Sequence, residues 1–227
     1  MTLNQIIGRY AVLLAAALLI FVLEPAMARS PEIPWDLSAV SLLLLLGSVR
    51  AVWENHRFFR VVALLGGLFW ISEAAETVLG GALPVVTDAC ALAFIGATIC
   101  GILYDVFSRR TVSADAVFGA AAVYLLIGLW FARAYMIIAH YEPEAFSASD
   151  ALMRYVTEEG YRATGALHYF SLITLTTVGY GDITPVDPIA RNLAAVEAVI
   201  AQLFIAAVVA RLVAVHTANL PTLNDKD

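Results

Sequence analysis

Long apolar segments alternate with short polar connections along most of the 227-residue chain. Apolar runs of about 18 residues or more are typical of helices that cross a bilayer. The pattern predicts six such helices, with one shorter apolar segment before the last of them. The predicted spans are residues 6–23, 37–53, 61–83, 85–107, 114–139 and 189–216.

The shorter apolar segment lies between the fifth and sixth spans, at residues 164–176. It is too short to cross a hydrocarbon core about 30 Å thick, so we expect a re-entrant helix there. Backbone that leaves the helical conformation at membrane depth is tolerated where it is buried in protein or lines water. The sequence therefore predicts an all-α membrane protein of six transmembrane helices, with a re-entrant pore helix between spans five and six.

The composition supports this class, because 61% of the residues are hydrophobic and only 14% are charged. Soluble domains average about 45–50% apolar residues and about a quarter charged ones. We expect membrane lipids around the chain and no nucleic-acid partner. Cys90 and Cys100 both lie in the fourth span and are expected to be buried small hydrophobic residues.

The placement of basic residues predicts the orientation, because cytoplasmic connections carry an excess of arginine and lysine. These residues fall on one side of the six spans together, and we expect both termini in the cytoplasm of a cell with the chain in its plasma membrane. The opposite side carries an acidic loop, which either attracts cations or only keeps that surface solvated. The basic residues are Arg9, Arg50, Arg57, Arg60, Arg109, Arg110, Arg211 and Lys226, and the acidic ones are Glu142, Glu144, Asp150, Glu158 and Glu159.

The segment that follows the short apolar helix reads Thr-Val-Gly-Tyr-Gly-Asp, residues 177–182. A potassium ion in a narrow pore must exchange its water shell for other oxygens, and backbone carbonyls can supply them. Successive carbonyls face one axis when the backbone alternates in handedness, and Gly179 and Gly181 adopt positive φ at low cost. We expect Val178 and Tyr180 to point away from the axis and to pack against the re-entrant helix.

This segment resembles the selectivity filter of the tetrameric potassium channel family, in its bacterial six-span form. The resemblance implies a homotetramer that conducts K⁺ passively, with K⁺ as the permeant ion, no other cofactor and no enzymatic activity. It also implies a hydrogen bond from Tyr169, where many relatives have tryptophan, to Asp182. The implied K⁺ ligands are Thr177, Val178, Gly179 and Tyr180, completed by Gly181, and the implied filter supports are Thr176, Asp182, Tyr169, Phe170 and Glu197.

The sixth span is expected to line the pore, by analogy with the family. Gln202, Ile205, Val209 and Val213 recur every three to four residues and share one face, where the two valines either form an apolar gate or only pack. Relatives commonly have a hinge glycine at the position of Ala201. Glu197 lies off this face, and we favour a structural hydrogen bond behind the filter over ion coordination.

The fourth span contains no arginine or lysine, although voltage-sensing relatives have an arginine ladder there. Moving one charge across 100 mV is worth about 2.3 kcal/mol, and steep gating needs several charges per subunit. We therefore expect a channel that is not strongly voltage-gated. The expected domains are a four-span bundle at residues 1–110, a pore domain at 111–218 and a short cytoplasmic tail at 219–227.

An unexpected charge cluster is predicted within the membrane. Glu73 and Glu76 share one face of the third span, Asp88 begins the fourth, and Arg133 lies at a similar depth in the fifth. We expect Arg133 to pair with Glu73 or Glu76, and a second acid either senses external pH or only faces outer water. An intramembrane metalloenzyme using these acids as ligands, and a transporter subunit with four pore loops per chain, are the alternatives. The metalloenzyme alternative has no His-x-x-x-His ligand set in this sequence. The transporter alternative needs four pore loops per chain, and this sequence has one.

Overall fold

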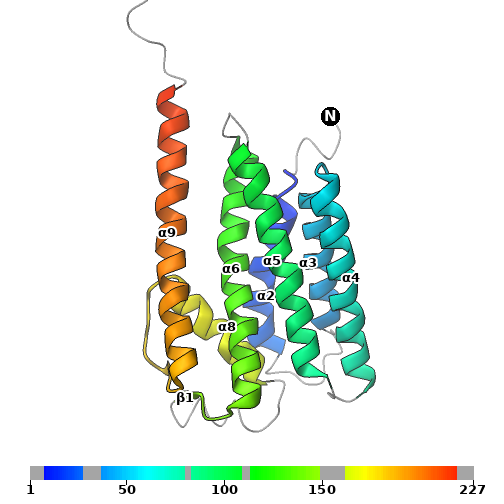
Figure 1. Ribbon diagram of the computed structural model, residues 1–227, viewed down its shortest axis with the longest axis vertical. Coiled ribbons are helices and arrows are strands. Elements are labelled where there is room, and N and C mark those ends of the chain that lie inside the picture. Colours follow the sequence, from blue (N-terminus) through cyan, green and yellow to red (C-terminus); the bar gives the residue numbers. More distant parts are fainter. Residues whose placement is uncertain (1–7, 28–36, 80–82, 109–112, 149–161, 219–227) are drawn as a thin grey trace, which may run out of the picture.

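The structure of the chain is a computed structural model that describes residues 8–27, 37–79, 83–108, 113–148 and 162–218 (Figure 1). Several residues used in the sequence analysis lie outside this part of the chain. They are Arg109 and Arg110, the loop acids Asp150, Glu158 and Glu159, Lys226 and the predicted tail at 219–227.

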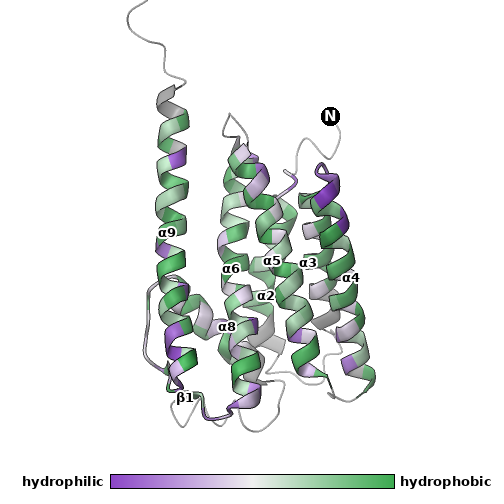
Figure 2. Ribbon diagram, in the orientation of Figure 1, coloured by the Kyte–Doolittle hydropathy of each residue, from purple (hydrophilic) through white to green (hydrophobic). Residues whose placement is uncertain are grey.

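The described residues are mostly helical, as the apolar pattern predicted. Within the described ranges, four helices are long and apolar enough to cross a membrane, and three apolar helices are shorter. Figure 2 shows apolar residues along the length of the helices, with polar residues gathered mainly toward their ends. The helices are α2 (Ala11–Met27), α3 (Leu37–Ala51), α4 (His56–Val78), α5 (Pro84–Ser108), α6 (Ala114–Tyr141), α8 (Arg162–Leu175) and α9 (Pro188–Ala218).

Six of these helices correspond in order to the predicted spans, and α8 corresponds to the re-entrant segment. The largest difference is at α4, which begins at His56 rather than at residue 61 and ends at Val78 rather than at 83. It begins early because Asn55 caps it: the Asn55 side chain accepts hydrogen bonds from the backbone N–H groups of Arg57 and Phe58. An Asn cap satisfies N–H groups that have no partner within the helix.

The helices α2 to α5 form a bundle beside α6, and small and aromatic residues form its core. A Cβ atom at Gly47 of α3 would lie 3.1 Å from the Leu13 Cα atom of α2, so glycine allows these two backbones to approach closely. Phe69 of α4 stacks on Phe94 of α5 with ring centroids 5.8 Å apart. The side chains that α4 and α5 direct inward thus join the two helices.

Helix α6 is the centre of the molecule, because it contacts α2, α5, α8 and α9. The indole nitrogen of Trp130 donates a hydrogen bond to the Leu92 carbonyl of α5 at 3.1 Å. Helix α9 instead stands at the edge of the molecule, and most of its surface is uncovered in the single chain (Figure 1). Helix α8 contacts α2, α6 and α9.

Two short strands, which the sequence analysis did not predict, add a small sheet to the helical fold. β1 (Phe146–Ala148) pairs antiparallel with β2 (Ile183–Pro185), in a register that places Ser147 opposite Thr184. The Ala145 carbonyl also accepts hydrogen bonds from the backbone N–H groups of Val186 and Asp187. The ribbon therefore ties the segment that enters α9 to the segment that leaves α6.

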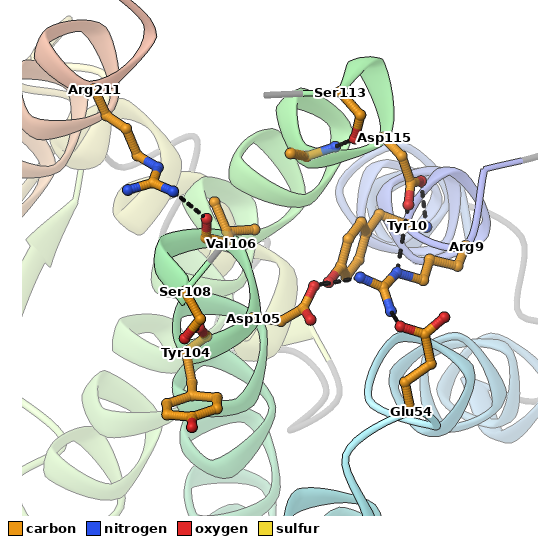
Figure 3. Close-up of polar contacts among 11 residues, drawn as sticks. Arg9, Tyr10, Glu54, Tyr104, Asp105, Val106, Ser108, Ser113, Asp115 and Arg211 are labelled. Atoms are coloured by element: carbon orange, nitrogen blue, oxygen red, sulfur yellow. Dashed lines mark hydrogen bonds and ion pairs between the residues drawn. The ribbon is translucent and has the colours of Figure 1, made fainter. Parts of the chain in front are cut away.

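A polar cluster joins four elements at the end of the bundle where α5 ends and α6 begins (Figure 3). Arg9 forms ion pairs with Glu54 at 2.6 Å, with Asp115 at 3.4 Å and with Asp105. The Tyr10 hydroxyl donates to the same Asp105 carboxylate. Arg9, which precedes α2, thus holds one acid after α3, one in the last turn of α5 and one in the first turn of α6.

Candidate functional site

The predicted filter follows directly from the C-terminal end of α8. The Thr176 N–H donates to the Leu172 carbonyl at 3.0 Å and continues the helix for one residue. The N–H groups of Val178 and Gly179 then both donate to the Ile173 carbonyl, at 2.9 and 3.2 Å. These bonds turn the chain out of the helix and hold the start of the filter segment against the helix end.

The filter backbone has positive φ at every second residue. The angles are +59° at Thr177, +54° at Gly179 and +76° at Gly181, whereas Val178 and Tyr180 between them do not have positive φ. The two glycines were expected there, but Thr177 was not, because a β-branched residue rarely adopts this conformation. Strained backbone of this kind is concentrated at functional sites. A backbone that alternates in this way is suited to direct consecutive carbonyl groups to one side.

The single chain leaves the filter segment open on one side. Val178 and Tyr180 are 51% and 73% exposed, so the expected packing of these side chains is not achieved within one chain. A Cβ atom at Gly179 or Gly181 would have no neighbouring atom within 4 Å. The predicted packing partner was the re-entrant helix, and the prediction did not say which copy of the chain supplies it.

Tyr169 and Asp182 brace the filter from the α8 side. The Tyr169 hydroxyl donates a hydrogen bond of 2.7 Å to Asp182 Oδ2, which is the bond that the family resemblance implied. Asp182 Oδ1 accepts from the N–H of Ile183, at the start of β2. The carboxylate therefore connects the middle of α8 to the outer end of the filter.

Phe170, the second predicted support, packs into an aromatic cluster. Its ring lies 5.1 Å from that of Tyr135 in α6 and 5.4 Å from that of Phe146 in β1, both in edge-on arrangements. Such aromatic pairs stabilise a contact beyond the area that they bury. Phe170 thus links α8 to α6 and to the ribbon, and it is buried.

Glu197 of α9 is completely buried behind the filter, at 0% exposure. The Tyr135 hydroxyl of α6 donates to Glu197 Oε2 at 2.6 Å, and the Ser171 hydroxyl of α8 lies 2.5 Å from Glu197 Oε1. Ser171 also lies 2.7 Å from the Gly128 carbonyl of α6. The structure thus contains hydrogen bonds of the kind predicted for Glu197, but its partners were not identified from the sequence.

A further contact that the sequence analysis missed lies at the C-terminal end of α8. The Tyr124 hydroxyl of α6 donates to the Leu175 carbonyl at 3.0 Å. Carbonyls in the last turn of a helix have no partner within the helix, so a side-chain donor satisfies one of them here. A Cβ atom at Gly128 would lie 3.2 Å from the Leu175 side chain, so glycine lets α6 approach α8 closely.

Helix α9 presents two different faces. Glu197 and Ala201 are fully buried against the rest of the chain, and Arg211 donates to the Val106 carbonyl of α5 at 2.8 Å (Figure 3). The predicted pore-lining residues lie on another face and are exposed in the single chain. They are Gln202, Ile205, Val209 and Val213.

The predicted intramembrane charge cluster includes an ion pair that the sequence analysis did not name. Arg133 pairs with Asp88 at 3.0 Å, and the two side chains are 15% and 12% exposed. Asp88 lies on α5, which packs along α6, and the predicted pairing of Arg133 with Glu73 or Glu76 stays a prediction. Glu76 and the buried His168 of α8 also contribute to the electrostatic field at Asp88.

His168 was not singled out from the sequence, because a lone histidine in a short apolar segment gives no specific signal. The metalloenzyme alternative would need a set of ligands gathered in one place. Among the residues that the structure describes, no group of three or more histidine, cysteine, aspartate or glutamate side chains is arranged to hold a metal ion.

Comparison with known proteins gives one match. A protein-family model described as an ion channel matches residues 125–218, which include most of α6, all of α8, the filter segment and α9. No curated protein and no solved structure matches the chain. The match and the apolar helices indicate that this multi-pass membrane protein is an ion channel.

Proposed function

We propose that the protein is a potassium-selective channel that conducts K⁺ passively. The observation that carries this proposal is the alternation of positive φ at Thr177, Gly179 and Gly181 within the Thr-Val-Gly-Tyr-Gly sequence. Rings of backbone carbonyls that replace the hydration shell of K⁺ are the known basis of such selectivity. The oxygens of Thr177 to Tyr180 are the proposed K⁺ ligands.

The functional unit in this proposal is a homotetramer. One chain supplies a single filter segment, which is exposed on one side and surrounds nothing by itself. Four copies around one axis would complete the carbonyl rings and cover Val178 and Tyr180, and closed cyclic symmetry is the usual arrangement of identical subunits. The exposed face of α9 with Gln202, Ile205 and the two valines would then line the cavity below the filter.

The remaining features of the proposal concern orientation and gating. The bundle at residues 1–110 would lie beside the pore domain at 111–218, in a plasma membrane, with both termini in the cytoplasm. Because α5 contains no arginine or lysine, the channel would not be strongly voltage-gated.

Reconstitution of the purified protein into liposomes tests the proposal. We expect potassium efflux that barium blocks, little sodium flux, and cross-linked species that end at four subunits. Equal sodium and potassium flux would contradict the selectivity, and a conducting monomer or dimer would contradict the tetramer.

A further inference from the structure

In the part of the chain that the structure describes, Glu197 is surrounded by hydroxyl groups and has no ion-pair partner. Near the carboxyl group lie the hydroxyl groups of Tyr135 and Tyr124 of α6 and of Ser171 of α8. Among the described residues, no arginine, lysine or histidine forms an ion pair with it. An ionised carboxylate at membrane depth is costly unless a partner charge or water compensates it.

The hydrogens available to this network can be counted. A serine hydroxyl has one hydrogen to donate, yet Ser171 Oγ lies within hydrogen-bond distance of two oxygens, Glu197 Oε1 and the Gly128 carbonyl. The carbonyl can only accept, so the contact at 2.7 Å needs the hydrogen of Ser171. The contact at 2.5 Å then lacks a hydrogen unless Glu197 itself supplies it.

An uncharged Glu197 satisfies every contact in the network. Its own O–H donates to Ser171 Oγ, Ser171 donates to the Gly128 carbonyl, and Tyr135 donates to Glu197 Oε2. An ionised Glu197 would have to accept a hydrogen bond from Ser171. The Ser171 hydroxyl oxygen and the Gly128 carbonyl oxygen would then face each other at 2.7 Å with no hydrogen between them. The geometry therefore fits the neutral acid and not the carboxylate.

The position of the network suggests what it does. Ser171 lies two residues after Tyr169 on α8, so the two side chains leave the helix about 200° apart. Tyr169 holds the filter through Asp182, and Ser171 holds α9 through Glu197. Helix α8 is thus fixed to the filter on one side and to α6 and α9 on the other. Glu197 lies one turn before the buried Ala201, where the family resemblance places a hinge.

We propose that Glu197 is a neutral acid whose proton completes a relay through Ser171 to Gly128, and that this relay positions the pore helix α8 against α9. Glu197 is a positioning residue in this account, because it acts on the filter through α8. The positioning role rests on the proposed function, whereas the protonation state does not depend on it.

Infrared spectroscopy of the full-length protein in lipid tests the protonation state without any measurement of current. We expect the difference spectrum between wild type and Glu197→Gln to contain a carboxylic-acid C=O band between pH 5 and 8. Ser171→Ala should shift this band because it removes the acceptor of the Glu197 proton. Ser72→Ala is the matched control, since the Ser72 hydroxyl bonds within α4 to the Phe69 carbonyl. A difference spectrum with carboxylate bands alone would overturn the proposal.

Two substitutions of Glu197 test the positioning role. Glutamine keeps the length of the side chain and can donate to Ser171 while accepting from Tyr135, whereas aspartate keeps the acid but is one methylene shorter. We expect glutamine to preserve potassium flux within about twofold and aspartate to lower it about tenfold, as for a buried polar group left unpaired. If the aspartate variant preserved potassium flux better than the glutamine variant, the acid group and not the relay would matter, and the proposal would be overturned. If the protein conducts sodium as well as potassium, the proposed selectivity fails while both comparisons remain valid.

Discussion

Replacing Arg133 by glutamine is expected to destabilise the protein strongly. Arg133 is the described ion-pair partner of Asp88, and both side chains are largely buried, at 15% and 12% exposure. Without the arginine, the Asp88 carboxylate would remain buried near the acidic Glu76, whose charge opposes it. Arg133 also lies over the Phe69 ring of α4, at 5.9 Å from its centroid, so the substitution loosens contacts with two helices.

The size of the effect follows from the burial and the distance. Two unit charges about 4 Å apart interact by about 4 kcal/mol at the effective dielectric constant of a partly buried site. Removing one partner of a buried pair typically costs about 3–5 kcal/mol, because the other charge remains uncompensated. For a chain of this length, each kcal/mol shifts the melting temperature by about 2–4 °C, so we expect a decrease of about 6–20 °C.

Asp88→Asn should cost less than Arg133→Gln, because an asparagine oxygen can still accept the hydrogen bond that Arg133 donates to Asp88 Oδ1. The double variant should be more stable than Arg133→Gln alone, since it leaves no uncompensated charge at this pair. Thermal unfolding in detergent, followed by circular dichroism, measures all three, and Arg60→Gln on the exposed side of α4 is the matched control. The reasoning fails if Arg133→Gln melts within 2 °C of Arg60→Gln, roughly the smallest shift expected for 1 kcal/mol, or if Asp88→Asn is the worse single variant.

Three further outcomes are expected. Gly179→Ala should abolish potassium selectivity in a flux assay, because a side chain at φ +54° costs about 1–2 kcal/mol per subunit, whereas Gly67→Ala within α4 should not change it. Tyr169→Phe removes the hydrogen bond to the Asp182 carboxylate and should destabilise the observed filter conformation about tenfold or more. Single-channel records should show this as altered open-time distributions, and Tyr141→Phe, at an exposed tyrosine, is the control. Open probability should change only shallowly between about −100 and +100 mV, because α5 contains no arginine or lysine to sense the voltage. A steep conductance–voltage curve would contradict this expectation.

The sequence predicted the local features well, because these depend on residues close together in the chain. The short apolar segment before the filter appears as α8, and the two filter glycines have the expected positive φ. The hydrogen bond between Tyr169 and Asp182 spans only 13 positions and was implied by a motif that includes both ends.

The contacts that the sequence did not predict join residues far apart in the chain. Glu197 bonds to Tyr135, 62 positions away, and Arg133 pairs with Asp88, 45 positions away. These pairs depend on which helices are neighbours and on their rotation, and neither follows from apolar periodicity. Positive φ at Thr177 was missed for another reason, because the preference of a threonine opposes it and only the surrounding structure imposes it.

The most direct test of the proposed function is the reversal potential of the purified protein in a planar bilayer, with potassium on one side and sodium on the other. If the carbonyls of Thr177 to Tyr180 form a selective filter, the reversal potential should lie far from zero, with the sign that potassium permeation gives. Tyr180→Asp should move it toward zero, whereas Tyr141→Phe should leave it unchanged. A reversal potential near zero for the unmodified protein would contradict the account.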